Sequence, residues 1–380
     1  MKKYNVGLLG CGDICDIYFK NCLSSQILNM AACASLHEEK AHRKAQEYNI
    51  PKACSIVDLI DDPQIDIILN LTVPEVHGKF NLAALEAGKH VYSEKPLAAV
   101  LEDGQNIIAL AKSNGLKVGC APDTFLGGRL QTCRKAIDEG LIGEPTAAAA
   151  FVVSPGHEWH HPNPEFFYKP GGGPLLDIGP YYLTALVSLL GPVKSCCGFS
   201  KTTFPERTVL CGPKLGEPIK VEVPTYISGT MEFSIGVIGT ITASFDIWDS
   251  QLPRIEVYGT AGTLCIPDVD PLEGPNVFGG PVLIKTKETS RWRGVPRKPE
   301  LSDWDELSVI HKYNENSRGL GLSDMAYAIR DRRPNRASSE MAYHVLEIGY
   351  ALLESARNMQ YYHLSSTCNR PDPPPVDFSL

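Results

Sequence analysis

The stretch VGLLGCGDIC, residues 6–15, decides the fold of the first part of the chain. Its apolar residues up to Leu9 predict a buried strand, and the residues that follow Gly12, to about Leu23, predict a helix. Between them, Gly10 provides a tight turn, and Gly12 lets the backbone approach a pyrophosphate at the helix N-terminus. The small residue that this glycine pattern needs in its third slot is Cys15. A glycine turn that follows a strand and opens a helix predicts a dinucleotide site.

Strand and helix patterns alternate over the first third of the chain. The predicted strands cover residues 4–9, 30–35, 65–71, 90–93 and 117–121, and the predicted helices cover residues 13–23, 38–48, 77–87 and 102–114. Strands separated by helices of this length indicate a parallel, doubly wound sheet of the α/β class.

The pattern changes after residue 124. Strands are predicted at residues 146–153, 193–199, 226–233, 237–246, 254–258 and 263–266, and helices at residues 130–139, 174–190 and 339–357. Turn signals at residues 234–236 and 259–262 favour antiparallel hairpins, and residues 267–303 form a Pro- and Gly-rich excursion. The sequence therefore predicts a Rossmann domain over residues 1–124. Residues 125–380 are predicted to form an α+β domain for substrate binding and oligomerisation, with a large, mostly antiparallel open sheet.

Composition narrows the class of protein. A length of 380 residues favours two domains. The net charge of −8 and the lack of a basic cluster exclude a nucleic-acid partner. No apolar run approaches the ~18 residues of a membrane span, and the one before Cys11 is too short for a signal peptide. Twelve scattered cysteines without a CxxC pair are typical of reduced thiols. We expect a cytoplasmic protein without membrane contact.

The end of the second strand bears on the cofactor. An acidic residue there binds the ribose of NAD, whereas a basic neighbour accommodates the phosphate of NADP. This chain has Ser35 and His37 in that region, and His37, Lys40 or Arg43 could meet a phosphate. The cofactor is predicted to be NAD(P), with NADP slightly favoured over NAD.

Two further motifs carry the chemistry. Lys95 follows the strand at residues 90–93, at the carboxyl edge of the sheet where ligands bind. Asp177 and Tyr181 follow three glycines and are four residues apart, so they would share one helix face. Hydride transfer to nicotinamide needs a base for the hydroxyl proton. A free tyrosine titrates near ~10, and a neighbouring ammonium makes it a better base.

These residues receive roles on that basis. Tyr181 is predicted to be the general acid/base, Lys95 its electrostatic partner and substrate donor, and Asp177 the orienting group; the roles of Lys95 and Tyr181 can be exchanged. The histidine-rich insert at residues 157–168 admits either a metal site or a substrate loop. Its spacing matches no known helical metal site and the chemistry needs no metal, so no metal is predicted. The predicted substrate-binding residues are Lys95, Asp123, His157, Trp159, His160, His161, Tyr168, Asp177 and Tyr181.

In this order and spacing, the motifs resemble the glucose–fructose oxidoreductase / inositol dehydrogenase / MocA family over nearly the whole chain. The resemblance extends to residues 72–77, to residues 84–96 (ALEAGKHVYSEKP) and to residues 257–262. It implies that Lys95 contacts the reacting hydroxyl. It also implies a set of cofactor-binding residues: Gly10, Gly12, Asp13 and Ile14 at the pyrophosphate, Ser35 and His37 at the adenosine ribose, and Thr72, Pro74, His77, Glu94 and Lys95 along the rest of the cofactor.

The chain departs from part of this family. Members similar to inositol dehydrogenase have histidine where this chain has Tyr181, and Thr184 stands where an aspartate is often found. Tyr181 agrees with the branch typified by glucose–fructose oxidoreductase and dimeric dihydrodiol dehydrogenase. The resemblance therefore implies sugar-like substrates without a specificity for inositol.

The leading hypothesis is an NAD(P)-dependent oxidoreductase that acts on a secondary hydroxyl or ketone of a sugar, polyol or glycoside. Two alternatives remain open at this point. One is an NAD-dependent glycosidase that oxidises its substrate transiently, which net cofactor reduction would distinguish. The other is a non-catalytic regulator that senses sugar or NAD, and such a sensor has no need of a proton relay.

The later strands also predict assembly. Residues 238–243 alternate apolar with small residues, as expected of a sheet with one face on the core and one free for a partner. We expect a homodimer or homotetramer, paired through residues 226–266.

Overall fold

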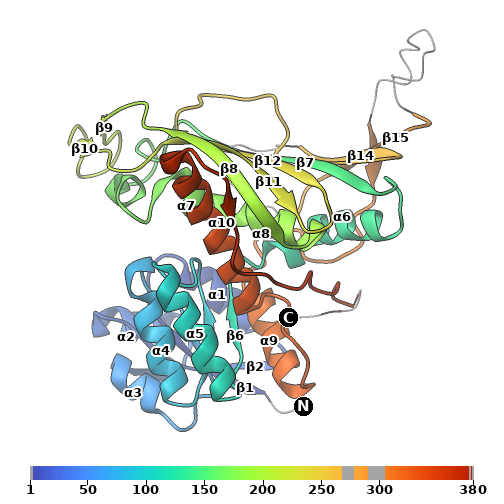
Figure 1. Cartoon of the computed structure of the whole chain (residues 1–380). Helices are drawn as coiled ribbons and strands as arrows, with labels where there is room; N and C mark the ends of the chain where they lie inside the picture. Colours follow the sequence, from blue (N-terminus) through green and yellow to red (C-terminus); the bar gives the residue numbers. More distant parts are fainter. Residues whose placement is uncertain (1–2, 268–277, 290–303, 376–377, 379–380) are drawn as a thin grey trace. The chain divides into compact units, whose positions relative to one another are not determined.

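The computed structural model of the chain describes residues 3–267, 278–289, 304–375 and 378 (Figure 1). They group into two compact units. The first comprises Met1–Gly127, Tyr313–Leu346 and Pro371–Leu380, and the second comprises Gly128–Lys312 and Glu347–Arg370. The sequence predicts a single boundary at residue 124, whereas the chain returns to the first unit twice after leaving it.

The first unit contains a six-stranded parallel sheet in the order β3-β2-β1-β4-β5-β6. Its strands are β1 (Tyr4–Leu9), β2 (Leu28–Ala34), β3 (Lys52–Cys54), β4 (Ile67–Asn70), β5 (His90–Ser93) and β6 (Val118–Cys120). This is the strand order of a dinucleotide-binding Rossmann sheet, with the change of winding direction between β1 and β4. The predicted doubly wound sheet is confirmed. The sequence does not predict β3, a three-residue edge strand with no fully buried side chain.

Helices and short 3-10 turns flank this sheet. They are α1 (Cys15–Cys22), α2 (Glu38–Tyr48), α3 (Ile56–Asp61), η1 (Pro74–Val76), α4 (His77–Glu86), α5 (Leu101–Ser113), η2 (Thr124–Leu126) and α9 (Leu320–Arg330). The sequence predicts neither α3 nor α9. Helix α9 packs beside β6 (Figure 1) although almost 200 residues separate them in the chain. The edge strand β6 is therefore covered by a helix from a late segment of the chain.

The second unit is built on a nine-stranded sheet in the order β16-β15-β14-β13-β7-β12-β11-β8-β17. Its strands are β7 (Pro145–Val153), β8 (Val193–Lys201), β11 (Tyr226–Phe233), β12 (Ile238–Ser244), β13 (Ile255–Gly259), β14 (Gly262–Ile266), β15 (Val282–Thr286), β16 (Asp305–Leu307) and β17 (Tyr362–His363), and a separate hairpin pairs β9 (Glu206–Thr208) with β10 (Pro218–Lys220). Among the strand pairs that the structure describes in this unit, only β7–β12 is parallel, so the predicted mostly antiparallel sheet is confirmed. Strand β15 lies within the Pro- and Gly-rich excursion, in which the sequence predicts no strand; residues 268–277 and 290–303 lie outside the described residues.

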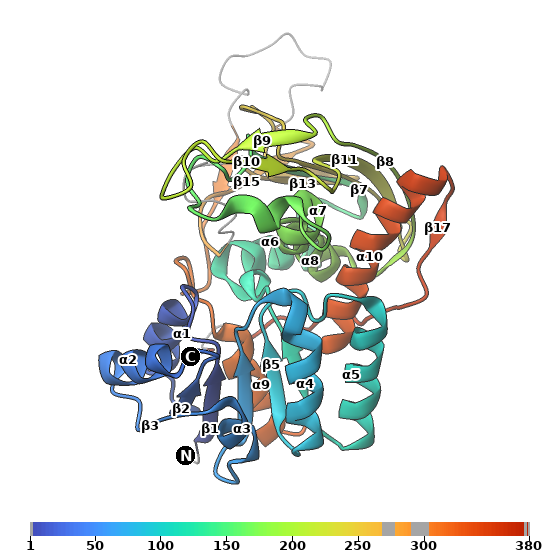
Figure 2. The ribbon, with the colours of Figure 1, turned by 90° about the vertical axis from the view of Figure 1, so that its left-hand side faces the viewer.

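Helices cover one face of this sheet (Figure 2). They are α6 (Gly128–Asp138), α7 (Gly173–Asp177), α8 (Gly179–Leu190) and the part of α10 (Ser339–Asn358) that belongs to this unit, with η3 (Pro164–Tyr168) before α7. Strand β11 shows the resulting alternation: Ile227, Met231 and Phe233 are buried, whereas Thr230 is exposed. In the part of the chain that the structure describes, no helix is long and apolar enough to cross a membrane.

Candidate active site

The glycine turn after β1 has the form that a bound dinucleotide requires. Gly10 has φ +105°, and a Cβ there would lie 2.6 Å from the Leu71 carbonyl oxygen, so only glycine fits. A Cβ on Gly12 would meet nothing within 4 Å, which leaves open space above its backbone. Asp13 is exposed and Ile14 half-buried, immediately before α1. Ile14, at the N-cap, has no side-chain oxygen to cap α1, and the Cys15 N–H donates to the Gly12 carbonyl oxygen at 3.1 Å. The turn fits a pyrophosphate.

The end of β2 combines both signs of charge. Ser35 is half-buried and His37 is exposed at the N-cap of α2. Glu38 and Glu39 follow in the first turn of this helix, so acidic groups stand beside the predicted ribose position as well as basic ones.

His77 ties together two turns at the carboxyl edge of the sheet. Its Nδ1 lies 2.7 Å from the Pro96 carbonyl oxygen, and its Nε2 lies 2.8 Å from the Thr72 carbonyl oxygen. The ring is buried, and Thr72 is fixed in turn by hydrogen bonds to the Asn70 carboxamide oxygen. His77 thus positions the backbone on either side of the predicted cofactor site, next to Pro74 in η1.

Glu94 and Lys95 follow β5 directly. The Glu94 carboxylate is buried and accepts hydrogen bonds from the Tyr18 hydroxyl, at 2.8 Å, and from the Lys95 backbone N–H, at 2.9 Å. The Arg318 guanidinium lies 3.9 Å from the same carboxylate. Glu94 therefore holds the backbone at Lys95 in place, at the sheet edge where the sequence predicts it. Tyr18 and Arg318 belong to this cluster and are not predicted by the sequence, because neither stands in a recognisable motif.

Asp123, a predicted substrate residue, lies beneath the start of α9. Its Oδ2 accepts hydrogen bonds from the N–H groups of Gly319 and Gly321, at 3.0 and 2.9 Å. Burial raises the pKa of Asp123 to about 6. The structure gives Asp123 the place of an anchor for α9, and its contact with substrate stays a prediction.

Asp177 and Tyr181 lie on two successive short helices. Asp177 ends α7, and Tyr181 stands in the first turn of α8, with 8% of its surface exposed. The Tyr181 N–H donates to the Ile178 carbonyl oxygen, at 3.1 Å, because the chain breaks its helix at Ile178. The prediction of one continuous helix over residues 174–190, with both side chains on one face by its regular spacing, is therefore wrong. The two residues lie on either side of this bend at Ile178.

The triple glycine brings the substrate loop against this bend. A Cβ on Gly172 would lie 2.5 Å from the Phe166 carbonyl oxygen, so the backbone at this glycine approaches the protein's own loop closely. In that loop the His157 ring stacks on Phe167, with centroids 4.2 Å apart, and meets the edge of Phe245 at 4.8 Å.

His157 is a neutral hydrogen-bonding group at pH 7. Burial lowers its pKa to about 4, although the Asp177 carboxylate acts in the opposite direction. Within the described residues its Nε2 has no hydrogen-bond partner. A neutral imidazole at this place can donate to, or accept from, a hydroxyl group.

The remaining residues of the loop differ in exposure. Trp159 is exposed, with its indole N–H bonded to the Gly156 carbonyl oxygen at 2.9 Å, and His160 packs against its ring. His161 is half-buried and accepts a hydrogen bond from the Asn163 N–H. Tyr168 has no exposed surface and its hydroxyl donates to Glu158, so the structure makes it a support of the loop instead of a platform for a sugar. No group of three His, Cys, Asp or Glu side chains among the described residues could hold a metal ion.

Comparisons with known proteins identify the class of each unit. Residues 4–121 match the family model described as "Oxidoreductase family, NAD-binding Rossmann fold". Residues 130–265 match the "GFO/IDH/MocA C-terminal domain". The first unit is thus an NAD-binding oxidoreductase domain. The chain belongs to the glucose–fructose oxidoreductase / inositol dehydrogenase / MocA family, and the resemblance found in the sequence is confirmed.

Individual proteins that are similar to this chain agree with this assignment to the family. The chain is 30% identical to 1,5-anhydro-D-fructose reductase of Ensifer adhaerens over 263 residues, which cover 68% of this chain and 74% of that protein. It is 23% identical to myo-inositol 2-dehydrogenase of Thermotoga maritima over 265 residues, which cover 70% and 75%. Its fold is similar to that of levoglucosan dehydrogenase in complex with NADH and L-sorbose, with TM-score 0.80, 20% identity, and coverage of 96% of this chain and 100% of the other.

These relatives are reductases and dehydrogenases of sugars or polyols. The match to the NAD-binding family model accordingly supports a nicotinamide cofactor. The alternatives of a glycosidase and of a non-catalytic regulator are not supported by them.

Proposed function

We propose that the chain is an NAD(P)-dependent dehydrogenase or reductase that acts on a secondary hydroxyl or ketone of a sugar, polyol or glycoside. The observation that carries the proposal is the turn at Gly10 and Gly12. It lies where a Rossmann sheet binds its dinucleotide, in a chain that also has Asp177 and Tyr181 after the glycines of its second unit.

The proposed reaction balances without a metal or a further reactant. The carbinol carbon loses hydride with its electron pair, which the oxidised nicotinamide accepts when it is bound. The hydroxyl proton goes to Tyr181, and the C–O bond becomes the carbonyl of a ketone. Lys95 donates to the substrate oxygen, while Asp177 orients the hydroxyl. Reduction runs through the same steps in reverse.

His157, Trp159, His160 and His161 are the proposed substrate contacts of the second unit. The His157 ring is neutral, and its Nε2 is buried without a hydrogen-bond partner among the described residues, so a sugar hydroxyl would reach it only after a rearrangement of the loop. Trp159 exposes part of its indole face, which suits the apolar face of a sugar ring. This loop supplies position and specificity, while the proton is moved elsewhere.

A carbohydrate screen tests the function. The purified protein is incubated with NAD or NADP and a panel of sugars, polyols and glycosides, and reduced nicotinamide is followed by its absorbance. Stoichiometric cofactor reduction with at least one compound is expected. A glycoside that is hydrolysed without net cofactor reduction would favour the glycosidase alternative, and binding without any turnover would favour the regulator.

A further inference from the structure

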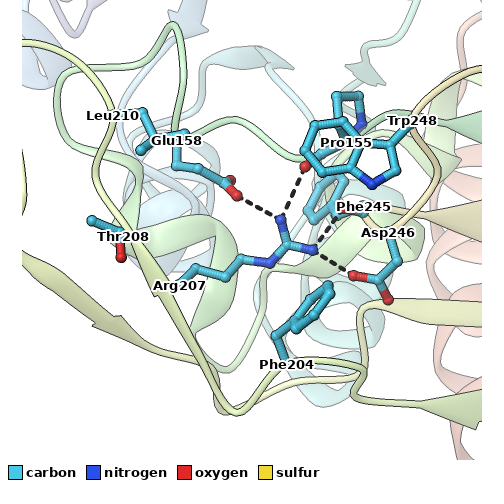
Figure 3. A pocket seen from close by; sticks show the side chains of 9 residues that line it. All are labelled: Pro155, Glu158, Phe204, Arg207, Thr208, Leu210, Phe245, Asp246 and Trp248. Carbon is cyan, nitrogen blue, oxygen red and sulfur yellow. Dashed lines mark hydrogen bonds and ion pairs between the residues drawn. The ribbon is translucent and has the colours of Figure 1, made fainter.

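A pocket lies in the second unit, and none of the predicted catalytic residues lines it (Figure 3). It is formed by the loop after β7, the chain around β9 and the loop after β12. Its volume is about 170 Å³. The residues that line it are Pro155, Glu158, Phe204, Arg207, Thr208, Leu210, Phe245, Asp246 and Trp248.

Arg207 forms the floor of this pocket. Only 7% of its side chain is exposed, and its guanidinium lies between the carboxylates of Glu158 and Asp246 (Figure 3). It also donates to the carbonyl oxygens of Pro155, at 3.0 Å, and Phe245, at 2.7 Å. These contacts tie the three loops to one another. Removing one member of this buried charge set would leave an uncompensated charge.

The carboxylates are themselves held in one orientation. Asp246 accepts a hydrogen bond from the Thr225 hydroxyl at 2.7 Å, and Glu158 accepts one from the Tyr168 hydroxyl. Burial and this bond to Glu158 raise the pKa of Tyr168, so its hydroxyl stays a donor. The floor is therefore preorganised, and its shape does not depend on a ligand.

The charge of the floor selects against anions. One guanidinium and two carboxylates leave a net negative charge, which repels carboxylate and phosphate groups. Each carboxylate oxygen has a second lone pair beyond the bond it already accepts, and the Thr208 side chain is exposed. Groups that donate hydrogen bonds without carrying negative charge, such as sugar hydroxyls, fit this floor.

The rim of the pocket is apolar. Trp248 is 86% exposed, Leu210 55% and Phe204 49%. A large exposed aromatic side chain beside a fixed polar floor offers one face for the C–H groups of a sugar ring and a base for its hydroxyls. The volume is roughly ten times the ~10–15 Å³ that one water molecule needs, which suits a single ring with its hydroxyls.

The pocket adjoins the predicted substrate loop. Glu158 follows His157 directly in the chain, and Phe245 lines the pocket while its ring contacts His157 at 4.8 Å. The same loop therefore contributes Glu158 to the pocket and His157 to the contact with Phe245. A substrate with two linked rings could reach from the predicted substrate loop into the pocket.

We propose that the pocket around Arg207 and Trp248 binds a second, non-reacting ring of a neutral glycoside substrate. This inference rests on the proposed function and narrows its substrate class from sugars in general to glycosides with at least two rings. The ring on the pocket side would stack on Trp248 and donate hydroxyl hydrogen bonds to Glu158 and Asp246.

Direct binding tests the inference independently of turnover. Saturation-transfer NMR is recorded for the whole protein with cellobiose, maltose, lactose and, as anionic probe, glucuronic acid. We expect transfer to at least one disaccharide, weak or absent transfer to glucuronic acid, and loss of the disaccharide signal in Trp248→Ala. Trp248→Phe should keep it in part. The matched control is Tyr361→Ala, which removes another exposed aromatic side chain of the same unit, outside the pocket.

Kinetics with the best substrates adds a second readout. In Trp248→Ala, KM for a disaccharide should rise by roughly tenfold, from the lost stacking and ring burial, while KM for a monosaccharide changes by less than about twofold. The inference is overturned if no disaccharide binds, if Trp248→Ala binds disaccharides as the wild type does, or if glucuronic acid binds better. A protein that binds disaccharides at Trp248 but reduces no cofactor would refute the proposed function and leave the pocket assignment standing.

Discussion

The cofactor part of the first unit and the substrate part of the second unit are built in different ways. In the first unit, Gly10 and Gly12 stand two residues apart; the backbone around Gly10 requires a glycine there, and Gly12 leaves open space above its backbone. In the second unit, Glu158, Arg207 and Asp246 come from segments far apart in the chain and meet only through their side chains. A site made by the backbone is visible in a short motif. A site assembled from side chains of distant loops is not.

The largest effect that tests this contrast is expected at Tyr181. If Tyr181 moves the proton, Tyr181→Phe should lower kcat by roughly 10²-fold or more, with little change in cofactor affinity, and Lys95→Ala should do the same. Turnover and cofactor titration are measured side by side. Tyr182, the next residue, is the matched control, since its buried hydroxyl bonds to Arg254 at 3.0 Å. Tyr182→Phe should keep kcat and lose about 1 kcal/mol of folding free energy. Near-normal kcat in Tyr181→Phe would remove it from the relay.

The next effect separates the two glycines of the turn. Gly10→Ala places a Cβ against the Leu71 carbonyl oxygen at positive φ, so it should lower the free energy of unfolding by roughly 2–5 kcal/mol. Gly12→Ala meets open space, so its unfolding free energy should stay within about 0.5 kcal/mol of the wild type.

Gly12→Ala should instead weaken the binding of the cofactor. Its new methyl group would stand where the pyrophosphate approaches the backbone, and the dissociation constant should rise roughly tenfold or more. Chemical denaturation and cofactor titration of both variants decide. A Gly12→Ala protein with normal cofactor affinity would mean that the dinucleotide does not cross this turn.

The parts predictable from the sequence follow the same division. The Rossmann sheet, its glycine turn and the position of Lys95 are predicted because residues close in sequence define them. The break at Ile178 is missed, because apolar periodicity continues through it from α7 into α8. Helix α9 is missed as part of the first unit, because its anchor Asp123 holds it from far along the chain. The Arg207 cluster gives no spacing signal at all.

The buried carboxyl of Asp123, which anchors α9, should make the stability of the protein depend on pH. Its pKa of about 6 lies above the ordinary value of 3.8, so the folded protein binds the proton more tightly than the unfolded chain does. Stability should therefore fall as pH rises from about 4 to about 6 and should lose at most about 3 kcal/mol from this group. In Asp123→Asn, this contribution to the pH dependence should vanish. Thermal unfolding of both proteins between these pH values measures the difference, and identical profiles would contradict the assignment.

Ser35 tests the least decided residue of the cofactor part. Ser35→Asp places a carboxylate at the end of β2, where it repels a 2′-phosphate and can bond a ribose hydroxyl. The ratio of NADP to NAD affinity should fall on the order of tenfold or more. Glu38→Gln, in the first turn of α2, is the comparison variant and should shift the ratio the other way. An unchanged ratio in Ser35→Asp would mean that the adenosine ribose lies elsewhere.

The smallest effect on activity is expected at the face of the second unit's sheet opposite to its helices. Thr230 on β11 pairs with Thr240 on β12, and both are exposed on that face, which carries no helix of the described residues (Figure 2). Small β-branched side chains make a flat surface that another sheet can approach closely, as in packed sheets. We therefore predict a homodimer or homotetramer through residues 226–266.

Light scattering behind a sizing column at micromolar concentration should show this assembly. Thr240→Lys should dissociate the assembly because a buried ammonium without a partner is unfavourable at such an interface. Cofactor affinity should remain unchanged, since the glycine turn belongs to the other unit. A wild-type monomer of 41.5 kDa would rule out this interface. An assembly that survives Thr240→Lys would place the contact on another surface.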